Sequence, residues 1–266
     1  LLHSHHGGDC GYPGFEVLNY ARHIEAGQKR QLEDEVRRDT SLDPRGYPQF
    51  AIRPPGERQE HHVLVYLEPM KGNEFAFGRD IRSAGAQGRG MEDLRTTNAI
   101  ISSGRLLNVG EGRFVGLAMR LPVHRQGMPL NTAEQRRAAF IGSVGAGYNV
   151  HKLMTGVLDE TTMKTMRYRL FDAGPVAGNH PGTDKPALLF DSAQIAMGIP
   201  AENYPVAEGE PGFDAVLPLE LAGRNWQLHF SAPKSSLIDR LDARLPWLVL
   251  AGGLLFGPLP GALLSA

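Results

Sequence analysis

The chain contains one cysteine, Cys10, so no disulfide can form within it. It also lacks an excess of charge of either sign, because 28 Lys and Arg residues nearly balance 29 Asp and Glu residues, for a formal net charge of −1. Nucleic-acid-binding domains usually carry a basic face, so this balance argues against nucleic acid as a partner. The opening residues show no positively charged segment followed by an apolar stretch, which is the pattern of a signal peptide.

Motifs for catalysis and metal binding are also missing. Gly142 to Gly147 reads GSVGAG, which is not the GxGxxG pattern of dinucleotide-binding loops, and Ser143 lacks the GxSxG context of a hydrolase nucleophile. We expect this segment to be a strand packed closely against a neighbouring element. Residue types that ligate metals occur near the N-terminus, at His3, His5, His6, Asp9 and Cys10. This glycine-rich terminus offers no framework for a metal site, so the sequence predicts no metal. Because catalytic and dinucleotide-binding motifs are missing as well, the sequence predicts no enzyme and no cofactor.

The composition is ordinary for a folded protein, with 41% hydrophobic and 21% charged residues. Abundant glycine (32 residues) and proline (19 residues) predict many turns, as in an α+β domain with long loops. A chain of 266 residues is long enough for one large domain or two smaller ones with their own cores.

The C-terminal segment from Leu245 to Ala266 carries no charged residue. Crossing a bilayer as a helix takes roughly 20 apolar residues, so this segment predicts a transmembrane helix with Trp247 as an interfacial anchor. A buried C-terminal helix is the alternative, but the glycines and prolines of this segment would disfavour a helix in a soluble protein. We expect the sequence to be part of a longer membrane protein.

The periodicity of apolar residues predicts the order of the main elements. Phe15, Leu18, Ala21 and Ile24 recur near helical spacing and predict a first helix. The other predicted helices lie at about 28–38, 90–97, 134–141 and from 151 onward, and the predicted strands at 61–69, 73–80, 100–103, 113–123, 140–150, 163–174 and 186–193. The segment LELAGRNWQLHF predicts a hairpin that turns at Ala222-Gly223-Arg224. His61 and His62 open a strand and are expected at its exposed edge.

Five segments in order carry a family resemblance: GYPGFEVLNYARHI, GYPQFAIRP, VYLEPMKGNEFAFGRD, LAMRLPVHR and FIGSVGAGYNVHKLM. The most specific piece is Glu68-Pro69-x-x-Gly72-Asn73 followed by Gly78-x-Asp80. Together the segments, over roughly residues 11–158, resemble the CHASE sensory domain. That family supplies the extracellular input domain of many bacterial diguanylate cyclases and histidine kinases and of plant cytokinin receptors.

The resemblance implies an α+β fold with two PAS-like subdomains, each an antiparallel sheet with flanking helices. We expect a membrane-distal subdomain with leading helices at residues 11–158 and a membrane-proximal subdomain at 159–236. A juxtamembrane and transmembrane helix would follow at 237–266. The chain would then lie in the periplasm, attached to the inner membrane by this helix, and the full-length receptor would be a homodimer.

A ligand site is expected in the first subdomain, between its sheet and the covering segments. By position, the family's ligand contacts fall near Glu68-Pro69 and Ser102, but this chain has Glu-Pro where the cytokinin receptors have Gln-Asp, so a cytokinin is not implied. A sensor pocket needs an apolar wall and a few oriented polar groups. The predicted ligand-binding residues are Tyr66, Glu68, Asn73, Phe75, Phe77, Asp80, Leu94 and Ser102. The alternative is that the aromatic residues are ordinary core, and that Asn73 and Asp80 bond to the backbone of turns.

The function that the sequence predicts is therefore an extracytoplasmic domain that binds a small molecule and signals across the membrane to a cytoplasmic cyclase or histidine kinase. Two alternatives stay open. The domain could be a structural or dimerising module that senses a partner protein, or a periplasmic hydrolase, although no nucleophile motif supports the second.

Overall fold

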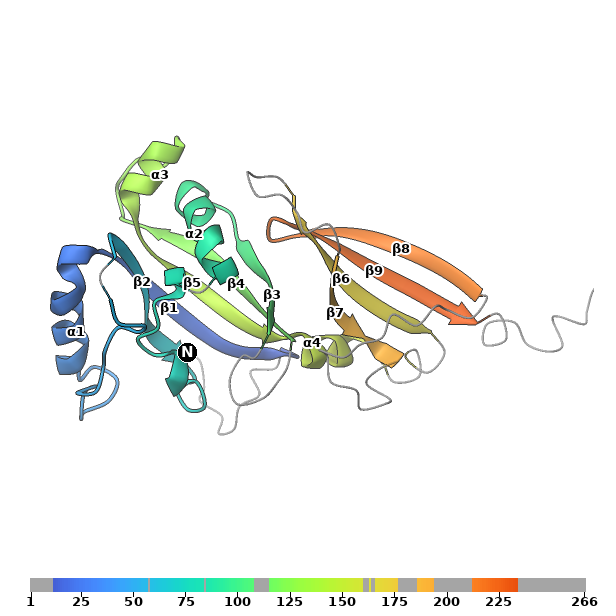
Figure 1. Cartoon of the computed structure of the whole chain (residues 1–266), viewed down its shortest axis with the longest axis horizontal. Coiled ribbons are helices and arrows are strands. Elements are labelled where there is room, and N and C mark those ends of the chain that lie inside the picture. The colour runs from blue at the N-terminus through green and yellow to red at the C-terminus, as the bar shows by residue number, and fades with distance from the viewer. Residues whose placement is uncertain are drawn as a thin grey trace, which may run out of the picture.

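The computed structural model describes residues 12–56, 58–83, 85–107, 115–159, 163, 166–176, 186–193 and 212–233. The described chain forms two antiparallel sheets that lie one after the other along the long axis of the molecule (Figure 1). The predicted α+β class, with two antiparallel sheets and flanking helices, is confirmed. The segment from His3 to Cys10, where no metal site is expected, and the predicted transmembrane helix lie outside the described residues.

The first sheet has five strands in the order β2-β1-β5-β4-β3. Its strands are β1 (Phe15–Glu25), β2 (Glu60–Glu68), β3 (Ile101–Leu107), β4 (Val115–His124) and β5 (Phe140–Asn149). Every neighbouring pair is antiparallel. The order places the first strand of the chain directly against the last strand of this sheet, with Phe15 opposite Tyr148.

The helix predicted for Phe15 to Ile24 is wrong, because this segment is strand β1. β1 lies between β2 and β5, and residues on both of its faces are buried, including Ala21 and Ile24. A strand covered on both faces carries apolar residues on both, so it loses the simple alternation that marks a half-exposed strand. The apolar residues of β1 therefore fell near helical spacing by coincidence.

Helices cover the two faces of this sheet. α1 (Lys29–Arg38) contributes Leu32 to a core with Ile24 and Val63, and we call this side the α1 face. α2 (Gly85–Thr96) contributes Met91 and Leu94 to a second core. The sheet residues of that second core are Ala21, Leu64 and Phe140, and we call their side the α2 face. Adjacent residues of a strand point to opposite faces, which is why Val63 and Leu64 of β2 serve different cores.

Short helices complete the first half of the chain. They are η1 (Ala26–Gln28), η2 (Glu74–Ala76), η3 (Ile81–Ser83), α3 (Ala133–Ala139) and α4 (Val150–Val157). The helices predicted near 28–38, 90–97, 134–141 and from 151 are confirmed as α1, α2, α3 and α4. The strand predicted for Asn73 to Asp80 is wrong, because η2 and a turn at Gly78, with a φ of 82°, occupy it.

The second sheet has four strands in the order β7-β6-β9-β8. They are β6 (Arg167–Pro175), β7 (Ala187–Asp191), β8 (Gly212–Leu221) and β9 (Arg224–Pro233). The hairpin predicted around Ala222-Gly223 is confirmed, with Leu221 opposite Arg224. Both residues between the strands have positive φ, 50° for Ala222 and 73° for Gly223, as tight hairpin turns of the I′ type require.

The two sheets share one apolar core. Val115 and Leu117 of β4 and Val150 of α4 pack with Tyr168, Leu170 and Trp226 of the second sheet. Backbone hydrogen bonds also join the halves, because the N–H of Ser102 donates to the carbonyl of Ala222 at 2.8 Å. Within the described ranges, no helix is long and apolar enough to cross a membrane. The predicted subdomain boundaries at residues 158 and 236 stay a prediction.

Two glycines of the segment between β2 and η3 offer a test of this packing. Gly78 and Gly72 both have positive φ, but a Cβ at Gly78 would lie 2.4 Å from the Ala51 carbonyl oxygen, whereas none lies within 4 Å at Gly72. We expect Gly72→Ala to lower the free energy of unfolding by about 1 kcal/mol through backbone strain. Gly78→Ala should cost about 2 kcal/mol more, because the backbone of residue 51 must move. Urea unfolding of both variants measures the difference, and equal losses would contradict the described contact.

Candidate functional site

The residues predicted to bind a ligand do not form one cluster. Tyr66 and Glu68 lie at the end of β2, opposite Tyr20 and Leu18 of β1, and Glu68 is exposed. Asn73 is half-buried and its amide donates to the Pro69 carbonyl at 3.0 Å. Phe75 is 41% exposed, so little of the fold packs against it.

Three further predicted residues lie in different places, with Phe77 half-buried and Leu94 and Ser102 buried. Phe77 packs against the core of the α1 face, with its ring centroid 4.9 Å from that of Phe50. Leu94 belongs to the core of the α2 face and is 1% exposed. Ser102 lies on β3, where its Oγ accepts a hydrogen bond from the Gly104 N–H at 3.2 Å. Of these three, only Leu94 lies in the core between the sheet and α2.

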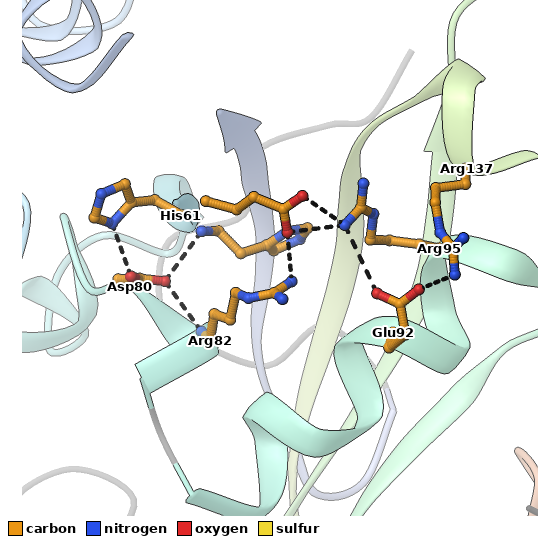
Figure 2. A network of polar contacts seen from close by, with 8 residues as sticks. His61, Asp80, Arg82, Glu92, Arg95 and Arg137 are labelled. Atoms are coloured by element: carbon orange, nitrogen blue, oxygen red, sulfur yellow. Dashed lines mark hydrogen bonds and ion pairs between the residues drawn. The ribbon is translucent and has the colours of Figure 1, made fainter. Parts of the chain in front are cut away.

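Asp80 is completely buried and its carboxylate is already occupied (Figure 2). Oδ1 accepts the backbone N–H groups of His62 at 3.0 Å and Arg82 at 3.1 Å. Oδ2 lies 3.1 Å from Arg58 Nη1 and 3.0 Å from His61 Nδ1. Buried carboxylates need such partners, and these bonds hold η3 against β2. This geometry matches the alternative reading of Asp80 as a residue that satisfies the backbone of a turn.

The expectation that His61 and His62 lie at an exposed edge is wrong, because they are 1% and 2% exposed. β2 is indeed at the edge of the sheet in its hydrogen bonding. Its side chains are nevertheless covered on both sides, since the α1 and α2 faces are both packed. His62 lies opposite His23 on β1 and on the same face as Leu64, so it points toward α2.

Ion pairs fasten α2 over the sheet (Figure 2). Arg95 of α2 reaches Glu60 of β2 at 2.8 Å, and Arg82 of η3 reaches the same carboxylate at 3.0 Å. Glu92, one turn before Arg95, pairs with Arg137 of α3. Because these pairs are only partly exposed, they add more to the position of the helix than surface pairs do. These ion pairs fix the C-terminal half of α2 over the sheet.

A buried polar cluster lies on the α2 face of the sheet. Arg120 of β4 donates from Nε to Ser143 Oγ at 2.8 Å, from Nη1 to Asn19 Oδ1 at 2.9 Å and from Nη2 to the Ser143 carbonyl at 3.2 Å. Ser143 Oγ also lies 2.8 Å from His62 Nε2. One guanidinium therefore joins three strands, and the cluster extends to a fourth. We call Asn19, His62, Arg120 and Ser143 the Arg120 cluster.

Burial sets the charges of the Arg120 cluster. It lowers the pKa of Arg120 to about 9, which still leaves the guanidinium charged at neutral pH. Burial also lowers the pKa of His62 well below its usual 6.5, and the nearby cation Arg120 acts in the same direction. His62 is therefore neutral. Since Arg120 only donates, the Ser143 hydroxyl accepts from it.

A serine and a histidine at 2.8 Å also form the first half of a hydrolytic triad. Ser143 is 0% exposed, however, so a substrate carbonyl could not reach its Oγ in this arrangement. A hydroxyl that accepts from a cation is moreover a weaker nucleophile. The geometry of the Arg120 cluster suits recognition of a ligand better than acyl transfer.

Sequence reasoning missed Arg120 and Asn19 altogether and considered Ser143 only as a nucleophile. A signal was present in the strand LAMRLPV, where one arginine interrupts an apolar run. The glycines of β5 were correctly interpreted as close-packing positions, because a Cβ at Gly145 would lie 2.5 Å from Arg120 Nη1. The sequence alone does not show that Arg120 and Gly145 are cross-strand partners.

The lowered pKa of His62 predicts a pH dependence of stability. Below about pH 6.5 the unfolded chain binds a proton that folded His62 does not, so the free energy of unfolding falls as the pH drops. The slope contributed by one such histidine is at most about 1.4 kcal/mol per pH unit. We expect His62→Gln to flatten the decline between pH 7 and 5 in urea unfolding, whereas His151→Gln, at an exposed position, should leave it unchanged. Parallel curves for all three proteins would contradict the burial of a neutral His62.

Several solved structures are similar to this chain at low identity. The periplasmic sensory domain of the Campylobacter jejuni chemoreceptor Tlp1 is 14% identical, over 88% of this chain and 76% of that one, with a TM-score of 0.45. The ligand-binding domain of the Pseudomonas aeruginosa PAO1 amino acid chemoreceptor PctC, in complex with GABA, is 12% identical over 82% and 74%, with a TM-score of 0.41. An extracellular ligand binding receptor from Desulfohalobium retbaense is 18% identical over 64% of this chain, with a TM-score of 0.40. This chain spans 28% of that receptor's length.

No curated protein matches the chain. The family model of the CHASE domain, in contrast, matches residues 9–187, which include the whole first sheet, β6 and the start of β7. The match covers well over half of the sequence and confirms the resemblance carried by the five segments. The chain therefore belongs to the CHASE domain family.

Proposed function

We propose that this chain is the extracytoplasmic sensory domain of a membrane receptor and that it binds a small molecule between the first sheet and α2. Membership of the CHASE family carries the sensory role. The Arg120 cluster supports the location, because it places oriented polar groups on the sheet face that also carries the apolar contacts to α2. Binding sites of small molecules commonly combine an apolar wall with a few such groups.

The shared core offers a route from the site to the second sheet. Arg120 points to the α2 face of β4, while Leu117 of the same strand packs against the second sheet. A ligand that shifts β4 or α2 would change the packing of Tyr168 and Trp226. Such a ligand moves the equilibrium between two arrangements only by its difference in affinity for them.

The remaining parts of the proposal concern the whole receptor. The second sheet would be membrane-proximal, and the segment 237–266 would lead into a transmembrane helix and a cytoplasmic cyclase or kinase. Both sheets would be PAS-like subdomains, and the full-length receptor would be a homodimer in the inner membrane. Leu94 is the sequence-predicted contact that fits a site under α2. Ligand contacts by Tyr66, Glu68, Asn73, Phe75, Phe77, Asp80 and Ser102 stay predictions.

A second candidate function is a module that senses a partner protein. The observation that favours it is the edge strand β8, whose apolar side chains are exposed on both faces. The exposed residues are Phe213, Val216, Leu217, Leu219 and Leu221, between 39% and 55%. Exposed apolar edge strands are sites where another chain can add.

Thermal unfolding of the chain against a library of small metabolites tests the proposed function. A ligand present at 100 times its Kd should stabilise the fold by about 2.7 kcal/mol. We expect at least one compound to raise the melting temperature and to bind with defined stoichiometry in native mass spectrometry. Leu219→Lys on β8 serves as the matched variant: it should keep ligand binding and lose any self-association.

The opposite pattern would favour the partner-sensing module. In that case no compound stabilises the chain, while Leu219→Lys abolishes a dimer seen by sedimentation. Phe77→Ala adds a further check on the location. Because Phe77 belongs to the α1 face, its loss should lower stability without changing the affinity for the ligand.

A further inference from the structure

Arg120 is a buried cation without a carboxylate partner. It is 8% exposed, and within the described ranges its three hydrogen bonds go only to Asn19 and Ser143. Other arginines with little exposure behave differently: Arg95, Arg167 and Arg224 reach carboxylates at 2.8, 2.5 and 2.8 Å. Removing an unpaired cation from water is costly, and such charges are normally paired. Arg120 therefore has the environment of an anion-binding group.

The guanidinium keeps donors free for an anion. A guanidinium has five N–H groups, and neutral oxygens of the described chain accept from Nε, Nη1 and Nη2 once each. One N–H on each terminal nitrogen is thus left over. Charge-assisted hydrogen bonds from arginine to a carboxylate are strong and directional, so these N–H groups can still donate to an anion.

The sheet beside Arg120 is built of small residues. Gly145 lies opposite Arg120, and Gly147, next but one on β5, lies opposite Ala118 of β4. A Cβ at Gly145 would lie 2.5 Å from Arg120 Nη1, so any side chain there would displace the guanidinium. A Cβ at Gly147 would lie 2.9 Å from the Val17 side chain. The absence of side chains at these two glycines is therefore what admits the Arg120 guanidinium and the Val17 side chain to this face.

The local charge distinguishes between kinds of anion. His62 is neutral, because burial lowers its pKa well below 6.5. Asn19 and Ser143 carry no charge either. Arg120 is then the single charge of the Arg120 cluster, which a carboxylate of charge −1 would neutralise. A phosphoryl group carries about −1.5 to −2 at neutral pH and would leave buried negative charge.

We infer that the ligand of this domain is a small organic monocarboxylate whose carboxylate binds the guanidinium of Arg120 on the α2 face. The inference rests on the proposed sensory function and adds the chemical class of its ligand. Asn19 and Ser143 hold the guanidinium in place, so they are positioning residues.

Isothermal titration calorimetry with matched pairs of compounds tests the inference on the intact chain. The probes are carboxylates and their amides: propionate and propionamide, butyrate and butyramide, benzoate and benzamide, and L-alanine and alaninamide, with inorganic phosphate as a further anion. We expect at least one carboxylate to bind about 10- to 100-fold more tightly than its amide, as charge-assisted hydrogen bonds imply. Arg120→Met should remove this preference, while Arg125→Met, at an exposed arginine directly after β4, should keep it.

A pair of glycine variants keeps the test decisive if Arg120→Met does not fold. Gly145→Ala should weaken carboxylate binding, because its Cβ shifts the guanidinium, whereas Gly27→Ala has nothing within 4 Å and should not. Equal binding of carboxylate and amide, binding of phosphate alone, or unchanged affinity in both Arg120→Met and Gly145→Ala would overturn the inference.

The binding measurements also test the proposed sensory function separately from the carboxylate inference. If neutral compounds of the metabolite library bind and carboxylates do not, the domain is a sensor for another ligand class. If no compound of any class binds, both the carboxylate inference and direct sensing fail together.

Discussion

The buried guanidinium of Arg120 constrains which residues can surround it in the first sheet. The guanidinium of Arg120 joins β1, β4 and β5, and it can do so only where its partners are oxygens and the opposite residue has no side chain. Gly145, Ser143 and Asn19 meet these demands. Strand alternation places Ala21 on the same side as Ser143, and the register shift between Val123 and His124 brings Phe140 there too, where both pack against α2. The helix, in turn, shields the cation from water and raises the strength of its hydrogen bonds.

Much of the architecture was readable from the sequence, and the failures have physical reasons. The hairpin at Ala222-Gly223 and the helices after Gln28 and Asn131 carry strong local signals, namely turn residues and charged helical faces. β1 was misread because a strand buried on both faces has no period of two. The five segments identified the family correctly, but they could not locate the buried polar groups. Arg120, Asn19 and Ser143 are far apart in sequence, and only strand register brings them together. Pairing of that kind has no local signature.

The two faces of the first sheet perform different tasks. On the α1 face, aromatic contacts among Tyr47, Phe50 and Phe77 build an apolar core. On the α2 face, histidines 23, 62 and 124 surround Phe140 with Arg95 at 6.0 Å from its ring. Buried Nδ1 of His23 and Nε2 of His124 have no hydrogen-bond partner within the described chain. Unsatisfied polar atoms of this kind reduce stability, and natural proteins retain them mostly where a function requires them.

The strand order β2-β1-β5-β4-β3 has a consequence for how the chain folds during synthesis. β1 is synthesised first, but one of its two neighbours is β5, and Phe15 finds Tyr148 only after nearly all of the first sheet has been made. Contacts so distant in sequence slow folding, and the apolar residues of β1 stay uncovered until β5 has been made. During that interval β1 can pair only with β2, as a hairpin with α1 between its strands. Secretion in an unfolded form would suit such a chain, because its first domain cannot close until its last strand arrives.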